Sequence, residues 1–372
     1  MNVLITGTRA PSSMDIIRSL VQQGHAVYSA DSMQFPLGRF VKGVKKHITL
    51  PKPNRDLPVF LQALKVILID HHIDVLIPTC EEIFFVSQGY DELSQYTRLF
   101  CEPFSRLLPL HNKYAFNQRV MQYQLDAPAS WLLTTQADKA LVPPNIPLVL
   151  KPIYSRFGAH VIIKPAPDLL QSLPLSVPYV AQEFITGKEY CAYAISDHGK
   201  LLIHSCYHPK YMAGPSAGIY FEPANMPSIT DFLTLFCMQY QFTGQIAFDF
   251  IFDGEKSLVL ECNPRATSGF HLIADHIDWS TLFDGQVQVE KFQTEPYMLG
   301  LGMKIHGLHY LIQNPKQFVS DYQRAHDVLK DSAYPWLGLK SLMTTANIVL
   351  RMIKKRKSFH EASTDDIEFN GK

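Results

Sequence analysis

Several classes of protein are excluded by what the sequence lacks. It has no excess of basic residues, because 34 lysine and arginine side chains face 34 acidic ones, and a protein that coats nucleic acid needs such an excess. It has no apolar run near the roughly 18 residues that would begin to span a bilayer. Its start lacks a basic segment followed by a long apolar stretch, so we expect no secretion signal there. With 47% hydrophobic residues, the chain is also too apolar for intrinsic disorder.

The cysteine pattern excludes a disulfide framework. The six cysteines are scattered and contain no CxxC pair. Disulfide frameworks are typical of short secreted chains, whereas this chain has 372 residues and no expected signal. We therefore expect free thiols, a cytoplasmic protein and enough length for two or three domains.

The first third of the chain alternates strand and helix signals. Short apolar runs over residues 2–6, 26–30 and 74–78 are typical of buried parallel strands. Between them lie a helical pattern that ends near Val21, with Ser12 or Ser13 as its cap, and a second one over residues 60–70. This alternation predicts a doubly wound parallel sheet over residues 1–110.

A glycine after the first strand and an acid after the second favour a dinucleotide site at first sight. These residues are Gly7 and Asp31. The fingerprint requires GxGxxG, however, and residues 7–12 lack the second and third glycines that let a backbone approach a pyrophosphate. The sequence therefore predicts the fold without nicotinamide binding.

The middle of the chain changes to strand-rich patterns with tight turns. Strands are expected at residues 148–150, running into Lys151 and Pro152, and at residues 161–164, 179–182 and 201–203. Residues 245–252 and 258–260 form an antiparallel pair joined near Asp253 and Gly254. Beyond Asp284 the pattern is less readable, except for helical apolar spacing over residues 340–353 before a basic run.

The strongest chemical signal lies on that hairpin. Residues two apart on a strand face one side, so Glu261 and Asn263 project together, and Asp249 on the neighbouring strand can join them. Two carboxylates and a carboxamide oxygen suit Mg²⁺, with Arg265 beyond them as a fork for phosphate or an oxyanion. The alternative is a surface hairpin with ordinary turn acids, and these residues alone leave the two interpretations about even.

Basic residues in two other places favour a phosphate site. Lys151 ends an apolar strand, where a charge is costly unless it meets an anion. The turn after it contains Ser155, Arg156 and Gly158, whose amides and side chains could wrap phosphates. Lys113 stands at the start of a helix, and taken alone it is better explained as a solvated surface amine.

Taken in order, these segments resemble the ATP-grasp superfamily, and among its branches the one similar to carbamoyl-phosphate synthase and carboxylate–amine ligases. The resemblance covers about residues 1–284. It rests on Asn112-Lys113, Leu150-Lys151-Pro152, residues 182–189, Asp249 and residues 261–265, and on residues 78–82 as a loop of the first domain. It implies a doubly wound (pre-ATP-grasp) domain at 1–110 and an ATP-grasp α+β fold with a small lid subdomain at 111–182 and a catalytic subdomain at 183–284. Residues 285–372, beyond the resemblance, are expected to form a helical extension.

The resemblance also implies roles for single residues. Lys113 and Lys151 would hold the ATP phosphates under a mobile loop that contains Ser155, Arg156 and Gly158, although this loop has fewer glycines than in many relatives. Adenine would be bound by Glu183 and by the backbone of Phe184 and Ile185. The ribose hydroxyls would be bound by Glu189. Mg²⁺ or Mn²⁺ would be held by Asp249, Glu261 and Asn263, while Arg265 and Lys151 would be catalytic.

The implied activity is an ATP-dependent ligase that activates a small carboxylate as an acyl phosphate and joins it to an amine. The alternatives are an ATP-dependent carboxylase or kinase acting on a small acid, and a nucleotide-binding regulatory module without turnover. Substrates are expected to be small molecules rather than nucleic acid, and a homodimer stays open.

Two weaker signals have competing explanations. His204, Cys206 and His208 alternate on one strand and could hold zinc, but a closed site needs a fourth ligand, so a place in the central sheet is preferred. The helix that ends in Lys354 to Lys357 could dock on anionic lipid or on a partner. Packing of that helix on the catalytic body is the favoured interpretation.

Overall fold

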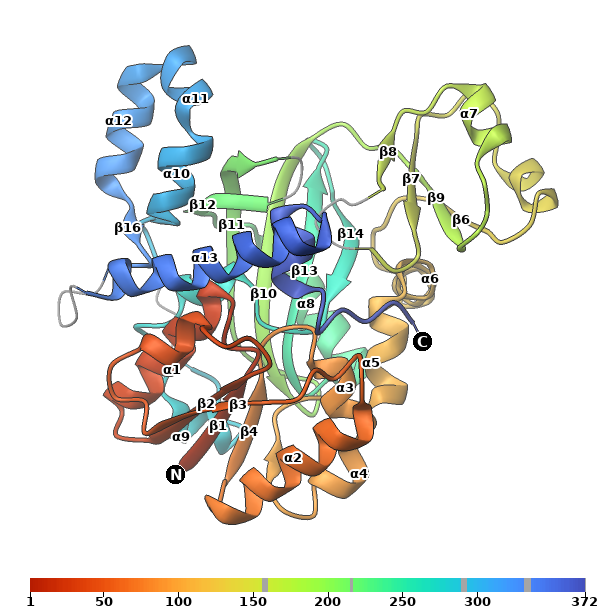
Figure 1. Ribbon diagram of the computed structural model, residues 1–372. Helices are drawn as coiled ribbons and strands as arrows, with labels where there is room; N and C mark the ends of the chain where they lie inside the picture. Colours follow the sequence, from red (N-terminus) through yellow and green to blue (C-terminus); the bar gives the residue numbers. More distant parts are fainter. Residues whose placement is uncertain (156–159, 215–216, 289–292, 331–335, 372) are drawn as a thin grey trace.

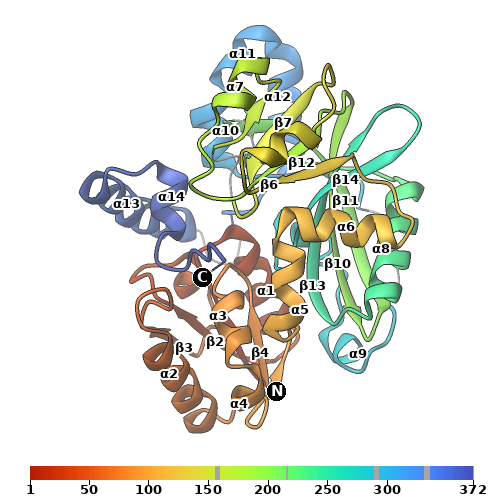
Figure 2. The ribbon, with the colours of Figure 1, turned by 90° about the vertical axis from the view of Figure 1, so that its right-hand side faces the viewer.

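The computed structural model describes residues 1–155, 160–214, 217–288, 293–330 and 336–371. These residues contain three sheets, of five, seven and four strands (Figure 1). The five-stranded sheet occupies the N-terminal region, while the seven-stranded sheet forms the centre of the molecule and the four-stranded sheet lies to one side (Figures 1 and 2).

The N-terminal sheet is parallel, with strand order β3-β2-β1-β4-β5. Its strands are β1 (Asn2–Thr6), β2 (Ala26–Asp31), β3 (Lys46–Thr49), β4 (Val75–Pro78) and β5 (Arg98–Leu99). The helical elements among them are α1 (Pro11–Gln22), η1 (Leu37–Phe40), α2 (Leu57–Asp70), α3 (Ile83–Gln88) and α4 (Tyr90–Leu93). A central β1 with buried Val3, Leu4 and Ile5 agrees with its continuous apolar run, and the predicted doubly wound sheet is confirmed.

The predicted start of α1 was wrong. Neither Ser12 nor Ser13 caps this helix, because it begins directly after Ala10 with Pro11 in its first turn. Proline fits that position since its fixed φ and missing N–H cost nothing there. Ser13 instead donates its hydroxyl to the Ala10 carbonyl from within the helix.

The four-stranded sheet is antiparallel, with order β6-β9-β7-β8. Two helices, α5 (Phe104–His111) and α6 (Lys113–Gln122), lead into it. Its strands are β6 (Ser130–Leu133), β7 (Leu148–Pro152), β8 (Ile162–Ile163) and β9 (Tyr179–Glu183), with η2 (Ala137–Leu141) and α7 (Pro167–Ser172) between them. A small core of its own, which contains Leu133, Leu150 and Ala181, holds this sheet together.

The seven-stranded sheet has the order β14-β13-β10-β11-β12-β15-β16. The strands are β10 (Lys188–Asp197), β11 (Lys200–Ala213), β12 (Ala217–Pro223), β13 (Gly244–Phe252), β14 (Ser257–Asn263), β15 (Tyr297–Met298) and β16 (His326–Asp327). Helix α8 (Pro227–Tyr240) covers one face, where Phe232 and Phe236 pack edge-to-face on Phe248. The predicted hairpin of β13 and β14 is confirmed.

The N-terminal domain and the large sheet share a buried apolar core, and two buried polar contacts cross it. His271, in η3 (Ser268–Leu272), lies with its Nδ1 2.7 Å from Oδ2 of Asp15 in α1, and both side chains are buried. The indole N–H of Trp279, in α9 (Trp279–Phe283), donates to Ser19 at 2.8 Å. These contacts fix the doubly wound domain against the sheet face opposite α8.

The C-terminal region is helical and returns to the N-terminal domain (Figure 1). It contains α10 (Gly300–His306), α11 (Leu308–Gln313), α12 (Pro315–Arg324), α13 (Leu337–Lys355) and α14 (Phe359–Thr364). After α14, Phe369 packs against Phe84, Phe85 and Phe104 of the first third. Among the described residues, no helix is both long enough and apolar enough to cross a membrane. The six cysteines are free, as expected.

Candidate active site

The β13–β14 hairpin brings the predicted metal ligands onto one face of the large sheet. Asp249 lies directly opposite Glu261 in the antiparallel register, and Asn263 follows two residues later on β14. The Asn263 side-chain nitrogen is 3.5 Å from the Asp249 carboxylate. A β-bulge between Asp249 and Phe250 shifts the register by one residue and so places all three side chains together.

Lys113 is not the surface amine that its isolated sequence context favoured. It is the first residue of α6, and the preceding Asn112 caps this helix by accepting from two backbone amides. The cap aims the buried Lys113 side chain at the hairpin, where its Nζ is 3.2 Å from Oε2 of Glu261. The same Nζ donates to the Ser155 carbonyl at 2.9 Å. Lys113 thus links the hairpin to the start of the predicted phosphate loop.

Lys151 reaches the same place from β7 of the small sheet. Its side chain is buried, and Nζ donates to the Leu260 carbonyl at 3.3 Å. Burial lowers the pKa of this amine to about 8, with Glu261 raising it and Lys113 lowering it further. A buried ammonium with one backbone partner has donors left for an anion.

The two facing carboxyl groups have unequal affinities for protons. Withdrawal from water, followed by the repulsion from Glu261, raises the pKa of Asp249. Burial acts in the same sense on Glu261, but Lys113 and Lys151 outweigh it, so the pKa of Glu261 is lowered. One carboxylate is therefore held charged by lysines while its neighbour resists charging, an arrangement that a bound cation would relieve.

Asn263 and Arg265 form a pair at the end of β14. The Arg265 guanidinium donates to the Asn263 side-chain oxygen at 3.3 Å and to the Ala266 carbonyl at 3.1 Å. For Asn263 to ligate a metal, its carboxamide has to rotate so that the oxygen leaves Arg265 and faces Asp249. Arg265 is partly exposed, which leaves donors of its fork available to a ligand.

The segment between the small and the large sheet contains the residues expected to bind the nucleoside. Glu183 ends β9, and the Phe184 amide donates to the Pro147 carbonyl at 2.8 Å, so only the Phe184 carbonyl can face a ligand. A Cβ on Gly187 would lie 2.3 Å from the Phe252 carbonyl, so this close approach requires glycine. Glu189 follows on β10 with an exposed side chain.

Parts of the predicted phosphate loop fall outside the described residues. Ser155 is described and accepts from Lys113 through its carbonyl. Arg156 and Gly158 lie outside the described residues.

Sequence reasoning missed two groups beside Asp249. Cys191 on β10 is the direct cross-strand neighbour of Asp249, and its thiol donates to that carboxylate. Tyr207 on β11 is the next residue across and hydrogen-bonds Cys191. Alternation along β10 could have placed Cys191 on this face, but pairing it with Asp249 requires the sheet register.

The zinc alternative gains no support from the structure. Among the described residues, no group of three or more His, Cys, Asp or Glu side chains could hold a metal ion. His204 Nε2 lies 3.0 Å from the Thr230 hydroxyl, and His208 Nδ1 lies 2.8 Å from the Glu189 carbonyl. A cavity of about 460 Å³ beside His204 and Cys206 has none of the hairpin carboxylates or lysines in its lining.

Comparisons with known proteins agree with this geometry. Residues 110–269 match the family model of the ATP-grasp domain. Comparison with curated protein sequences gave no match.

Several solved structures share the fold. N5-carboxyaminoimidazole synthetase from Staphylococcus aureus complexed with ADP superposes with a TM-score of 0.64 at 14% identity, over 93% of this chain and 96% of that one. For the L-amino acid ligase from Bacillus licheniformis, the TM-score is 0.59 at 18% identity, over 78% and 75%. For phosphoribosylamine–glycine ligase from Thermotoga maritima, it is 0.59 at 14% identity, over 80% and 78%. Residues 110–269 of this chain are therefore an ATP-grasp domain, as the sequence motifs implied. In the chain this domain follows the doubly wound N-terminal domain.

Proposed function

We propose that the protein is an ATP- and Mg²⁺-dependent ligase that activates a small-molecule carboxylate as an acyl phosphate and joins it to an amine, with release of ADP and phosphate. The observation that carries the proposal is the convergence of two carboxylates and two buried lysines on the β13–β14 hairpin: Asp249, Glu261, Lys113 and Lys151. The three solved structures named above are two ligases and a synthetase, the synthetase with ADP bound.

The donor set fits a divalent cation of the hard class. Asp249 and Glu261 offer carboxylate oxygens, and Asn263 adds a carboxamide oxygen once it turns away from Arg265. Oxygen-only sets of this kind suit Mg²⁺ or Mn²⁺. When bound, such an ion would neutralise charge on the phosphates.

The chain's own cations complete the phosphate site. Lys113 and Lys151 would bind the ATP phosphates from two sides, one from α6 and one from β7. In the first step, a substrate carboxylate oxygen bonds to the γ-phosphorus and ADP leaves. In the second step, the amine nitrogen bonds to the acyl carbon, the bond from that carbon to the phosphorylated oxygen breaks, and phosphate leaves with this oxygen while the nitrogen loses a proton to phosphate or water. Arg265 would stabilise the negative charge of the acyl phosphate, and neither step needs a protein nucleophile.

The inter-sheet segment would hold the nucleoside. Glu183 and the Phe184 carbonyl would accept from the adenine amino group, the Ile185 backbone would meet the ring edge, and Glu189 would bind the ribose hydroxyls. Lys164 already stacks on the Phe184 ring, 4.3 Å from its centroid, and stiffens this side. The four-stranded sheet would act as the lid that keeps water from the acyl phosphate.

Phosphate release from ATP, measured with pairs from a panel of small acids and amines, tests this function. The proposal expects release that requires Mg²⁺ together with one acid and one amine, and a product with a new C–N bond by mass spectrometry. Release that needs the acid alone favours the carboxylase or kinase alternative. Tight ATP binding without turnover on any pair favours the regulatory module.

The lowered pKa of Lys151 predicts a pH dependence of nucleotide binding. An ammonium binds phosphate better than a neutral amine, and Lys151 loses its proton as pH rises through about 8. The apparent Kd for ATP is therefore expected to rise roughly tenfold one pH unit above that value, because only the protonated fraction binds well. At pH 8.5 binding should take up roughly 0.7 proton, seen by calorimetry in buffers of different ionisation enthalpy.

The matched variant is Lys151→Arg, whose guanidinium stays charged over this range. It should remove both the proton uptake and the pH dependence while retaining ATP binding. Wild-type protein that binds ATP equally at pH 7 and pH 9 without proton uptake contradicts the prediction.

A further inference from the structure

Helix α13 presents its apolar side to solvent. Seven residues of this segment are exposed and apolar: Trp336, Leu339, Leu342, Met343, Ala346, Leu350 and Ile353. At 100° per residue they fall within an arc of about 120°, so they form one stripe along the helix. Leu350 and Ile353 are each 67% exposed. We call these seven residues the outer stripe.

The opposite side of α13, which packs on the body, is the more polar one. Its buried residues are Leu337, Ser341, Thr344 and Ile348, two of them with hydroxyl groups. Ile348 packs on Met33 of the N-terminal domain. A surface helix ordinarily shows the reverse distribution, with its apolar side inward. Packing of this helix on the body, the interpretation favoured from the sequence, therefore buries only one side of α13. Among the described residues, nothing covers its apolar stripe.

The same helix carries charge of one sign. Residues 336–357 contain six basic residues and no acidic one, in a chain whose formal net charge is zero. Arg351 and Lys355 are ion-paired with the tail carboxylates Asp365 and Asp366. Lys354, Arg356 and Lys357 are exposed and have no ion pair within the described part of the chain. Three free cations thus stand at the C-terminal end of the outer stripe.

Two exposed aromatic residues stand at the ends of this segment, Trp336 as the first residue of the outer stripe and Phe359 beyond it. Trp336 precedes the first turn and is 64% exposed, and Phe359 follows the basic run at the start of α14. Figure 2 shows α13 and α14 at the edge of the molecule, away from the seven-stranded sheet. A flat surface can approach this side without meeting the small sheet.

We propose that the outer stripe and the cations after it bind the surface of an anionic lipid bilayer, with α13 lying in the interface. An anionic bilayer offers an apolar layer for Leu350 and Ile353 beneath a charged layer for Lys354, Arg356 and Lys357. Tryptophan is enriched at this depth because its ring is apolar and its N–H is polar. The contact would hold the ligase at a membrane without a spanning helix.

Charge favours lipid over a second copy of the chain. Two α13 helices paired through their outer stripes would bring together segments that carry only cations. Like charges at close range oppose such pairing, whereas anionic headgroups attract them. The observations therefore favour a lipid surface, and self-association becomes an outcome that the experiment must detect.

The experiment is flotation of the full-length protein with vesicles of phosphatidylcholine alone or mixed with phosphatidylglycerol. The protein should float with the mixed vesicles and not with the neutral ones, and added salt should weaken binding. The paired change Leu350→Glu and Ile353→Glu should lower the partition coefficient at least roughly tenfold. Replacing Lys354, Arg356 and Lys357 by glutamate should have a similar effect.

The matched control is the pair Leu235→Glu and Met238→Glu, which places the same two charges three residues apart on the exposed side of α8. It should float like wild type, and an unchanged melting temperature should show that each variant is folded. Absence of flotation with anionic vesicles overturns the proposal. So does a wild-type dimer, seen by light scattering, that Leu350→Glu converts to monomer without any vesicle binding.

Discussion

Glu261→Gln is expected to lower kcat for ATP-dependent phosphate release by roughly two to three orders of magnitude. Glutamine keeps the size of the side chain and removes its charge. Of the two carboxylates that face the lysines only Asp249 then remains, and burial still raises its pKa although the repulsion from Glu261 is gone. Lys113 also loses the partner that lies 3.2 Å from its Nζ, so both the cation and the phosphates lose their anchor.

The control for this prediction is Glu255→Gln in the exposed turn of the same hairpin. Both variants lose one negative charge from the same hairpin, and only Glu261 faces the lysines. Steady-state phosphate release, together with calorimetry of ATP binding, separates lost turnover from lost affinity. A Glu261→Gln enzyme within about threefold of wild type would remove this residue from the proposed mechanism.

The hairpin could be predicted from the sequence because its strands and its turn depend on local patterns. The strand period puts Glu261 and Asn263 on one face, and the turn at Asp253 and Gly254 sets the partner strand. Asp249 opposite Glu261 does not follow from these two facts alone, because a β-bulge between Asp249 and Phe250 shifts the pairing by one residue. The family motifs added the order of the segments, and the match over residues 110–269 confirms the ATP-grasp domain that they implied.

The surroundings of Lys113 could not be predicted from local patterns. Its burial depends on α6 docking against β14, a packing that no local pattern encodes. The partnership of Cys191 with Asp249 likewise depends on which strand lies beside β13. Arg9 and Asp366 form a buried ion pair although they stand 357 positions apart in the sequence. Local periodicity predicts elements, while such contacts arise only when the elements pack.

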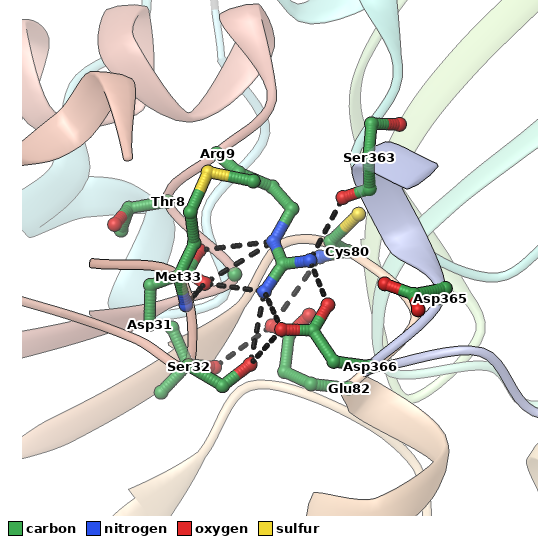
Figure 3. A network of polar contacts seen from close by, with 12 residues as sticks. Thr8, Arg9, Asp31, Ser32, Met33, Cys80, Glu82, Ser363, Asp365 and Asp366 are labelled. Carbon is green, nitrogen blue, oxygen red and sulfur yellow. Dashed lines mark hydrogen bonds and ion pairs between the residues drawn. The ribbon is translucent and has the colours of Figure 1, made fainter. Parts of the chain in front are cut away.

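Arg9→Met is expected to be the most destabilising single change outside the candidate active site, at about 3–5 kcal/mol. Figure 3 shows why: the Arg9 guanidinium lies between Asp31, the last residue of β2, and Asp366 of the C-terminal tail. Each contact is 2.5 Å long, and Arg9 also donates to the Ser363 carbonyl at 2.8 Å. Without Arg9, the buried carboxylates of Asp31 and Asp366 lie close together, and only Asp366 still has an arginine partner, its ion pair with Arg351.

Acid should act on the same contact. Burial would raise the pKa of Asp366, but Arg9 and Arg351 outweigh it and lower the pKa well below its ordinary value of 3.8. A carboxyl with a lowered folded-state pKa adds stability above its unfolded pKa and loses it as pH falls below that value. The free energy of unfolding should thus fall below about pH 4 in wild type, and less steeply in Asp366→Asn.

Urea unfolding of Arg9→Met, Asp366→Asn and the double variant measures the coupling between the two residues. The double variant should be less destabilised than the sum of the single ones, because Asp366→Asn removes a charge that Arg9→Met leaves without its arginine. Exposed Arg39→Met in the same domain is the matched control and should change stability by less than about 0.5 kcal/mol. Additive penalties, or an Arg9 variant as stable as the control, would show that the tail is not held by this ion pair. Because Phe369 of that tail packs beside His111, which ends the helix before Asn112 and Lys113, a tail released by Arg9→Met should also weaken ATP binding.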